Sequence, residues 1–192
     1  MCALEDESGK DVVRRFPVDQ MSRDAAILIP LYRSVEGEMH VVLVRRSEGG
    51  IHGGQLAFPG GKHEKRDMSM MDTALREARE EIGLETKMVK IIVHLPIVET
   101  KTTEFRVFPF LAGLAAPGKW CRSEREVTEI IDVKLSDLAQ PEAHGREIEH
   151  FPTWPEPREI SFYRVGPYRL WGLSYRILQP LIPSLLAGEW PI

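Results

Sequence analysis

A double glycine that leads into a short acidic helix constrains this chain more than any other feature. The segment from Gly60 to Gly83 reads GGKHEKRDMSMMDTALREAREEIG. Ser69 followed by Asp72 has the spacing of a capping box, which starts a helix, and Gly83 is a natural C-terminal stop. The sequence therefore predicts a helix of about fourteen residues between these two signals.

One face of this helix is apolar and is expected to pack on a core. Its residues recur at i, i+4, i+7 and i+11, and they are Met71, Leu75, Ala78 and Ile82. At about 100° per residue, Glu77, Glu80 and Glu81 project along a neighbouring strip, within an arc of roughly 100°. The three carboxylates are therefore expected to converge.

This convergence is unfavourable unless a positive charge lies nearby. Like charges three or four residues apart each cost about 0.2–0.5 kcal/mol, and the helix dipole disfavours anions in the last turn. Arg76 can reach Glu80 at i+4, but one arginine does not balance three glutamates. Because oxygen ligands without His or Cys suit Mg²⁺ or Mn²⁺, we expect a divalent cation here.

The residues before the helix point to a phosphate. Phe58-Pro59-Gly60-Gly61 predicts a turn whose glycines have no side chains, so that backbone groups can come close to a metal ion or a phosphate. Mg²⁺ in proteins usually shares its ligand shell with the phosphates of a substrate. A metal-bound diphosphate is therefore the ligand that these features favour.

The segment resembles the Nudix box, the signature of hydrolases that cleave nucleoside diphosphates linked to another moiety. The matching residues are Gly61, Arg76-Glu77, Glu80-Glu81 and Gly83. The resemblance implies that the three helix glutamates are catalytic and bind Mg²⁺ or Mn²⁺, with the Gly60 carbonyl as a further metal ligand. It also implies that Arg76 orients a glutamate and that water attacks one phosphorus. The implied fold is α/β, the Nudix-type α/β/α sandwich with a mixed central β-sheet.

The spacing inside the segment favours one subgroup of this family. The stretch from Gly61 to Arg76 is one residue longer than in the usual box, and Asp67 stands where that box places a glutamate. The same spacing occurs in the subgroup that resembles coenzyme A pyrophosphatases. The subgroup pattern is matched by His52, Gly54-Gln55, Phe58-Pro59-Gly60-Gly61, Glu64 and Asp67. The implied substrate is coenzyme A or acyl-CoA, which would give 4′-phosphopantetheine and 3′,5′-ADP.

One stretch departs from the subgroup pattern and leaves the substrate open. Between Ser47 and His52 the chain is one residue short, and Gly49-Gly50 stands where the subgroup usually has a leucine and a basic residue. A second hypothesis therefore keeps the chemistry and changes the substrate to ADP-ribose, a nucleotide sugar or a dinucleoside polyphosphate. A third is a non-catalytic nucleotide-binding module, against which the intact Arg76-Glu77 and Glu80-Glu81 pairs argue.

Several residues near the box are candidates for further roles. The substrate-binding candidates are Arg45, Arg46, Gly60, Gly61 and Lys62. Nudix enzymes often recruit another catalytic acid from outside the box, and two residues here qualify. Glu129 is expected to point to the same face of its strand as apolar neighbours, where an ionised carboxylate needs a partner. Glu126 begins a Glu-Val pair that recurs in the family. The choice between these two acids stays open.

Two other features have plainer interpretations. His52 lies beside glycines, where a structural hydrogen bond in a turn explains it better than catalysis does. The aromatic stretch from Phe151 to Pro155 is either scaffold or a lid over the substrate.

Composition is compatible with one catalytic domain that follows a polar arm. A chain of 192 residues, 43% of them hydrophobic, can bury a sizeable core. We expect an arm over residues 1–23 and a single hydrolase domain over residues 24–192. The net charge of −4 argues against bulk nucleic-acid binding, so the expected partner is a small nucleoside diphosphate derivative. Members of the family are frequently homodimers, which keeps that assembly open.

The sequence also predicts a soluble, cytoplasmic protein. Cys2 and Cys121 are isolated and lack CxxC spacing, and no secretory signal is seen near the start. The longest apolar run, around residues 25–32, is far shorter than the roughly 20 residues that cross a bilayer. We therefore expect no membrane partner.

Hydrophobic patterns outline the remaining elements. The expected strands cover residues 26–31, 40–44, 89–98, 105–114, 127–135 and 158–165. A Glu36-Gly37 turn joins the first two strands into a hairpin, and a short helix is expected to begin at Ser136 and to end at Pro141. Residues 141–158 read as a long loop. A closing helix over residues 171–186 is expected to be disturbed by Pro180 and Pro183.

Overall fold

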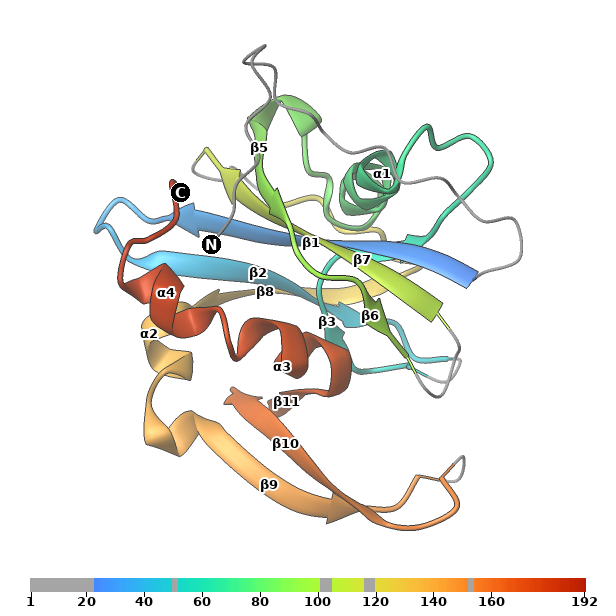
Figure 1. The fold of residues 1–192 in the computed structure, drawn as a ribbon, viewed down its shortest axis with the longest axis vertical. Coiled ribbons are helices and arrows are strands. Elements are labelled where there is room, and N and C mark those ends of the chain that lie inside the picture. Colours follow the sequence, from blue (N-terminus) through green and yellow to red (C-terminus); the bar gives the residue numbers. More distant parts are fainter. Residues whose placement is uncertain (1–22, 50–51, 101–104, 116–119, 152–153) are drawn as a thin grey trace, which may run out of the picture.

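The computed structural model describes residues 23–49, 52–100, 105–115, 120–151 and 154–192, which fold into two β-sheets and several short helices (Figure 1). The predicted arm lies outside this part of the chain, except for Arg23, which begins the first strand.

The larger sheet is mixed, as the sequence predicted. Its eight strands are β1 (Arg23–Arg33), β2 (Met39–Arg46), β3 (Leu56–Ala57), β4 (Gly60–Lys62), β5 (Val89–His94), β6 (Val98–Glu99), β7 (Phe105–Leu114) and β8 (Val127–Lys134). The order is β3-β2-β1-β7-β5, while β4 pairs with β1, β6 with β7 and β8 with β2. Strands β1 and β7 run parallel, and the other pairs are antiparallel.

The hairpin of β1 and β2 confirms the first two predicted strands. Leu31 pairs with Val41, and Gly37 in the turn has a φ of +83°, a conformation that glycine adopts at little cost. Since side chains alternate along a strand, Ile29 faces one hydrophobic core and Leu28 faces the other. The sheet therefore needs cover on both faces.

The expected strand over residues 89–98 is divided into two. Strand β5 ends at His94, and Pro96 follows before the short strand β6 begins. Proline has no backbone N–H to donate to a strand ladder, which explains the interruption. A one-turn 3₁₀ helix, Thr86–Met88, precedes β5.

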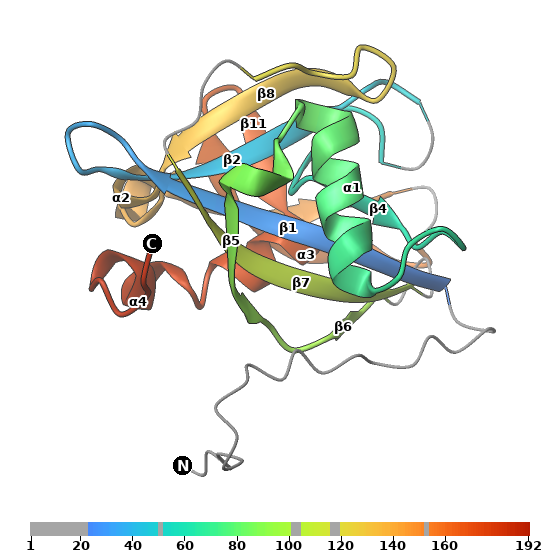
Figure 2. The ribbon, with the colours of Figure 1, turned by 90° about the horizontal axis from the view of Figure 1, so that it is seen from above.

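Helix α1 (Met70–Ile82) covers one face of the large sheet (Figure 2). Ser69 is its N-cap and accepts a hydrogen bond of 3.1 Å from the Asp72 N–H. Gly83 ends it in the left-handed conformation, with a φ of +71°. Both predicted ends of this helix are therefore confirmed.

The buried stripe of α1 differs from the predicted one. The apolar residues that are buried on it are Met70, Ala74, Ala78 and Ile82. Met71 and Leu75 are only half-buried and lie at the margin of the same core. The buried stripe is thus turned relative to the predicted one, and Glu81 lies on the buried side of the helix.

The smaller sheet contains two strands, β9 and β11, that the sequence did not predict. Its strands are β9 (His144–Glu149), β10 (Arg158–Val165) and β11 (Tyr168–Trp171), in the order β11-β10-β9. A 3₁₀ turn, Pro141–Ala143, and strand β9 occupy the first half of the segment that was expected to be a loop. The prediction was wrong there because HGREIE has almost no apolar alternation, and β9 is held by its backbone pairing to β10.

The closing helix is broken, as its prolines predicted. Helices α3 (Gly172–Leu178) and α4 (Ile182–Leu186) lie on either side of Pro180. Pro183 lies in the first turn of α4, where a missing N–H costs little. The short helix α2 (Leu135–Leu138) begins where β8 ends. None of the helices in the described ranges has the length and apolar character that crossing a bilayer requires.

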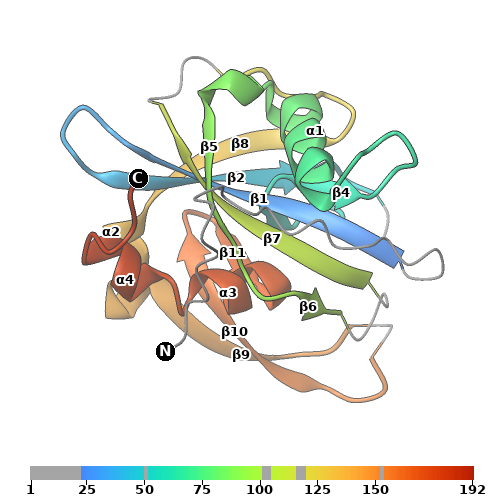
Figure 3. The ribbon, with the colours of Figure 1, turned by 45° about the horizontal axis from the view of Figure 1, so that its top comes forward.

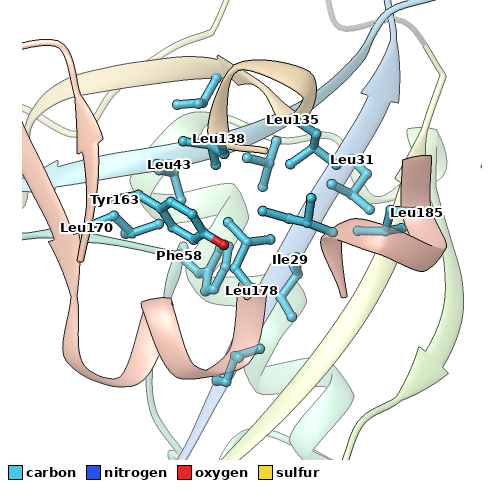
Figure 4. Close-up of a cluster of buried hydrophobic side chains, with 14 of the residues drawn as sticks. Ile29, Leu31, Leu43, Phe58, Leu135, Leu138, Tyr163, Leu170, Leu178 and Leu185 are labelled. Atoms are coloured by element: carbon cyan, nitrogen blue, oxygen red, sulfur yellow. The ribbon is translucent and has the colours of Figure 1, made fainter. Parts of the chain in front are cut away.

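Two hydrophobic cores separate the layers. Helix α1 packs on one face of the large sheet, and α3, α4 and the smaller sheet pack on the other (Figure 3). Figure 4 shows the second core, where Tyr163 from β10, Leu170 from β11 and Leu178 from α3 meet Ile29 and Leu43 of the large sheet. The glycine turn and α1 therefore rest on a sheet that is packed on both faces.

Candidate active site

The double glycine lies directly against the acidic strip of α1. Strand β4 pairs with β1, so that Gly60 is opposite Ile27, and the Gly60 N–H donates a buried hydrogen bond of 2.9 Å to Glu81 Oε2. A Cβ on Gly61 would lie 2.5 Å from the carboxylate of Glu77. Only glycine leaves room for this carboxylate, so the turn and the helix form one site.

Arg76 is the centre of the site. Its side chain is only 7% exposed, and its Nε and Nη2 donate to the two oxygens of Asp67 at 2.8 and 3.0 Å. Nη2 also donates to the Lys62 carbonyl at 2.9 Å. Nη1 donates to Glu77 at 2.7 Å and to Glu80 at 3.0 Å. Arg76 therefore ties the glycine turn to two of the three helix glutamates.

Asp67 anchors this arginine, a role that its position in the box did not reveal. Thr73 Oγ1 and the Glu64 N–H each donate to Asp67 Oδ2 at 2.9 Å. Burial acts to raise the pKa of Asp67, but the hydrogen bonds from Arg76, Glu64 and Thr73, with the charge of Arg76, outweigh it and lower that pKa to about 2. Asp67 is therefore a fixed negative charge.

Two of the helix glutamates are strongly desolvated. Burial raises the pKa of Glu81 to about 7, against the opposing effects of the Gly60 N–H and the charge of Arg46. Burial also raises the pKa of Glu77, although Arg76 opposes the change. The charge of Glu126 raises both values further. The protein alone thus leaves these carboxylates short of positive charge.

The chemistry of this donor set fits an oxygen-preferring divalent cation. Glu77, Glu80 and Glu81 offer only carboxylate oxygens, which Mg²⁺ and Mn²⁺ favour, and a cation would offset their burial. Within the described ranges, no three His, Cys, Asp or Glu side chains are arranged to hold one ion jointly. Arginines and the Gly60 N–H engage the carboxylate oxygens in this conformation.

The structure separates the two predicted arginines, which are neighbours in the sequence. Arg46 Nη1 lies 3.8 Å from Glu81 Oε1, on the α1 side of the sheet. Arg45 donates to Glu48 at 2.8 Å, and its guanidinium lies 5.0 Å from the centre of the Tyr168 ring. Of these two arginines, it is therefore Arg46 whose guanidinium lies near a helix carboxylate.

The two candidate acids from outside the box are also separated. Glu126 lies close enough to Glu77 and Glu81 for its charge to act on both. Glu129 pairs with Arg45 in the strand register, and its carboxylate accepts a hydrogen bond of 2.7 Å from the Tyr168 hydroxyl. Glu129 therefore points with Arg45 toward the smaller sheet.

The remaining predicted residues take peripheral positions. The Lys62 side chain is exposed and lies 5.6 Å from the centre of the Phe105 ring, while its carbonyl accepts from Arg76. His52 Nδ1 lies 3.2 Å from Gln55 Oε1 within a turn. Phe151 stacks on Trp171 with ring centres 5.0 Å apart, and residues 152–153 of that stretch lie outside the described ranges.

The match to known families agrees with this geometry. The family model described as NUDIX domain matches residues 21–169, which include the glycine turn and all of α1. This chain belongs to the Nudix hydrolase family. It is therefore a pyrophosphohydrolase that acts on a nucleoside diphosphate derivative, in a family that generally uses divalent metal ions.

Similar curated proteins come from bacteria and from a plant. The uncharacterized Nudix hydrolase NudL of Enterobacter sp. (strain 638) is 32% identical over 183 residues, which cover 93% of this chain and 87% of that protein. NudL of Pectobacterium atrosepticum is 36% identical over 170 residues, with coverage of 86% and 83%. Nudix hydrolase 22, chloroplastic, of Arabidopsis thaliana is 33% identical over 175 residues, which cover 84% of this chain and 55% of that protein.

Solved structures share the fold. The MutT/nudix family protein from Enterococcus faecalis has a TM-score of 0.57 at 16% identity and covers 88% of this chain and 66% of its own. The Nudix hydrolase RenU from M. smegmatis has a TM-score of 0.52 at 22% identity, with coverage of 61% and 73%. The mixed central sheet with helices on both faces is thus the Nudix fold.

Proposed function

We propose that this Nudix hydrolase cleaves the diphosphate bridge of coenzyme A or an acyl-CoA and releases 4′-phosphopantetheine and 3′,5′-ADP. The observation that carries the proposal is the run of residues from His52 to Asp67, which matches the pattern of the coenzyme A pyrophosphatase subgroup. The relatives named above do not carry a substrate in their names, so the substrate rests on this pattern.

The backbone around this run supports the proposal. The Arg46 N–H donates to the Gln55 carbonyl at 3.0 Å, and the Gly54 N–H donates back to the Arg46 carbonyl at 3.1 Å. The next residue, Ser47, donates to the Glu126 carbonyl at 2.9 Å. Gly54 and Gln55 of this run thereby hold the backbone of Arg46, and its neighbour Ser47 holds that of Glu126.

Glu77, Glu80 and Glu81, with the Gly60 carbonyl, would hold Mg²⁺ or Mn²⁺. When bound, the ion would neutralise phosphate oxygens and lower the pKa of a water molecule. Arg76 keeps Glu77 in place against Gly61, and the Gly60 N–H orients Glu81.

Hydrolysis needs no covalent intermediate with the protein. The water oxygen bonds to one phosphorus while the bridging P–O bond breaks, and the water proton passes to a carboxylate. We assign this proton to Glu126, because it is the acid from outside the box that faces Glu77 and Glu81. Arg46 lies on the same side and would contact the substrate phosphates.

A substrate panel tests the proposal. The purified chain is incubated with CoA, acetyl-CoA, ADP-ribose, a nucleotide sugar and a dinucleoside polyphosphate, each with Mg²⁺ or Mn²⁺, and the products are identified by mass spectrometry. We expect the highest kcat/KM for CoA or acetyl-CoA, with 3′,5′-ADP as a product. If kcat/KM were tenfold or more higher for another member of the panel, the proposed substrate would be wrong, while the proposed reaction would stand.

Three further expectations belong to this proposal. Residues 24–192 act as one catalytic domain, the protein works in the cytoplasm, and two copies associate as a homodimer. Light scattering on the purified chain tests the last point, because a dimer has twice the mass of 21.9 kDa that one chain has.

A further inference from the structure

Both carboxylate oxygens of Glu80 are engaged by arginines. Oε2 accepts from Arg76 Nη1 at 3.0 Å, and Oε1 accepts from Arg66 Nη2, also at 3.0 Å. The two arginine side chains differ in exposure and in the number of partners that hold them. The Arg76 side chain is 7% exposed and holds Asp67 and Glu77 as well, whereas the Arg66 side chain is 60% exposed. Arg66 is therefore the arginine that a cation could displace from Glu80.

A closed turn places Arg66 over Glu80. The Asp67 N–H donates to the Glu64 carbonyl at 2.9 Å, and the Glu64 N–H donates to Asp67 Oδ2 at 2.9 Å. Arg66 Nε then lies 2.8 Å from Glu64 Oε2, so that the guanidinium bridges Glu64 and Glu80. Asp67 is itself fixed by Arg76, which ties this turn to α1.

We propose that Arg66 competes with the divalent metal ion for Glu80 and thereby sets the metal concentration at which the site fills. The inference rests on the proposed role of Glu80 as a metal ligand. A carboxylate oxygen that accepts from a guanidinium has one binding direction fewer for a cation, and two positive charges cannot share it closely. Arg66 must move before Glu80 binds metal through Oε1.

The size of the effect follows from exposure. An ion pair between exposed side chains is weak and is screened by salt, so its loss changes affinity by only a small factor. We expect Arg66→Gln to tighten Mn²⁺ binding about two- to fivefold at low salt, with a smaller gain at high salt. Arg66→Lys keeps the charge and is expected to bind Mn²⁺ like the unaltered chain.

The experiment measures Mn²⁺ binding without substrate, by electron paramagnetic resonance of free Mn²⁺ in a titration. Lys65→Gln is the matched control, because Lys65 is the exposed neighbour of Arg66 and forms no ion pair within the described ranges. It removes the same charge from the same turn. Tightening by Arg66→Gln alone supports the inference, and equal tightening by both variants would attribute the gain to charge in general and overturn it.

A second variant separates this inference from the proposed function. Glu80→Gln is expected to weaken Mn²⁺ binding in the unaltered background and to abolish the gain from Arg66→Gln. Unchanged or weaker binding by Arg66→Gln, with Glu80→Gln still weaker than the unaltered chain, would overturn the competition and leave the metal site standing. If the unaltered chain binds no Mn²⁺, the proposed metal site fails and the competition fails with it.

Discussion

Asp67 holds Arg76 through two hydrogen bonds, of 2.8 and 3.0 Å, between side chains that are 3% and 7% exposed. The pair joins the turn before α1 to the middle of that helix. Because the other donors of Arg76 reach the Lys62 carbonyl, Glu77 and Glu80, the positions of two candidate metal ligands depend on Asp67.

We expect Asp67→Asn to destabilise the folded protein by about 3 kcal/mol, because it leaves the charge of Arg76 buried without its main partner. Urea denaturation at pH 7 measures the free energy of unfolding. Glu85→Gln is the control, since Glu85 makes an exposed ion pair with Lys87 at 2.6 Å, and its loss should cost under about 1 kcal/mol. Equal costs for both variants would show that the buried pair contributes no more than a surface pair.

The same carboxylate predicts a pH dependence of stability. The pKa of Asp67 falls from the usual 3.8 to about 2 in the folded state, so the unfolded chain binds the proton more readily. The contribution of Asp67 is therefore complete above about pH 4 and is lost as pH falls toward 2. The free energy of unfolding should drop more steeply between pH 4 and 2 in the unaltered chain than in Asp67→Asn. Parallel curves for the two proteins would contradict the lowered pKa.

Gly61→Ala should damage catalysis more than folding. The added Cβ would lie 2.5 Å from the carboxylate of Glu77, which must move away. A displacement of about 1 Å in a catalytic group can cost about a hundredfold, so we expect a loss of that order in kcat. Gly113→Ala serves as the control, because its Cβ meets nothing closer than 3.7 Å. A Gly61→Ala enzyme with more than half of the original kcat would argue against Glu77 at the reaction centre.

Glu81→Gln is expected to lower activity without lowering stability. Burial raises the pKa of Glu81 to about 7, which means that the charged form is unfavourable at that position without a cation. The neutral amide keeps an acceptor for the Gly60 N–H. We therefore expect kcat to fall by at least about a hundredfold while the Tm of the metal-free protein stays equal or rises. Near-normal turnover would remove Glu81 from the metal site.

Local signals explain which parts of this fold and site could be predicted. Ser69 and Gly83 act within one turn of chain, so both ends of α1 followed from the sequence. Strand β9 did not, because its residues are polar and its place is decided by backbone pairing with a distant strand. The anchor role of Asp67 was missed for a similar reason, since its partner Arg76 lies nine residues away and across a turn.

Arg45 and Arg46 show the limit of a single sequence at the site. The side chains of adjacent residues in a strand point to opposite faces of the sheet, and the sequence alone does not state which face α1 covers. The structure places Arg46 near Glu81 and Arg45 against Tyr168. The two candidate acids from outside the box, Glu126 and Glu129, are separated in the same way, because Glu129 lies opposite Arg45 in the strand register.

This division predicts different kinetics for the two arginines. Arg46→Gln should raise the KM for the diphosphate substrate by about ten- to a hundredfold, because a charge-assisted hydrogen bond to a phosphate contributes about 1.5–3 kcal/mol. Arg46→Lys should recover part of the loss. Arg45→Gln removes a cation that stacks on Tyr168 and pairs with Glu48, so it should lower the Tm and change KM less than twofold. Steady-state kinetics and thermal melts of the three variants measure both effects, and a larger KM change for Arg45→Gln than for Arg46→Gln would place the substrate on the other face of the sheet.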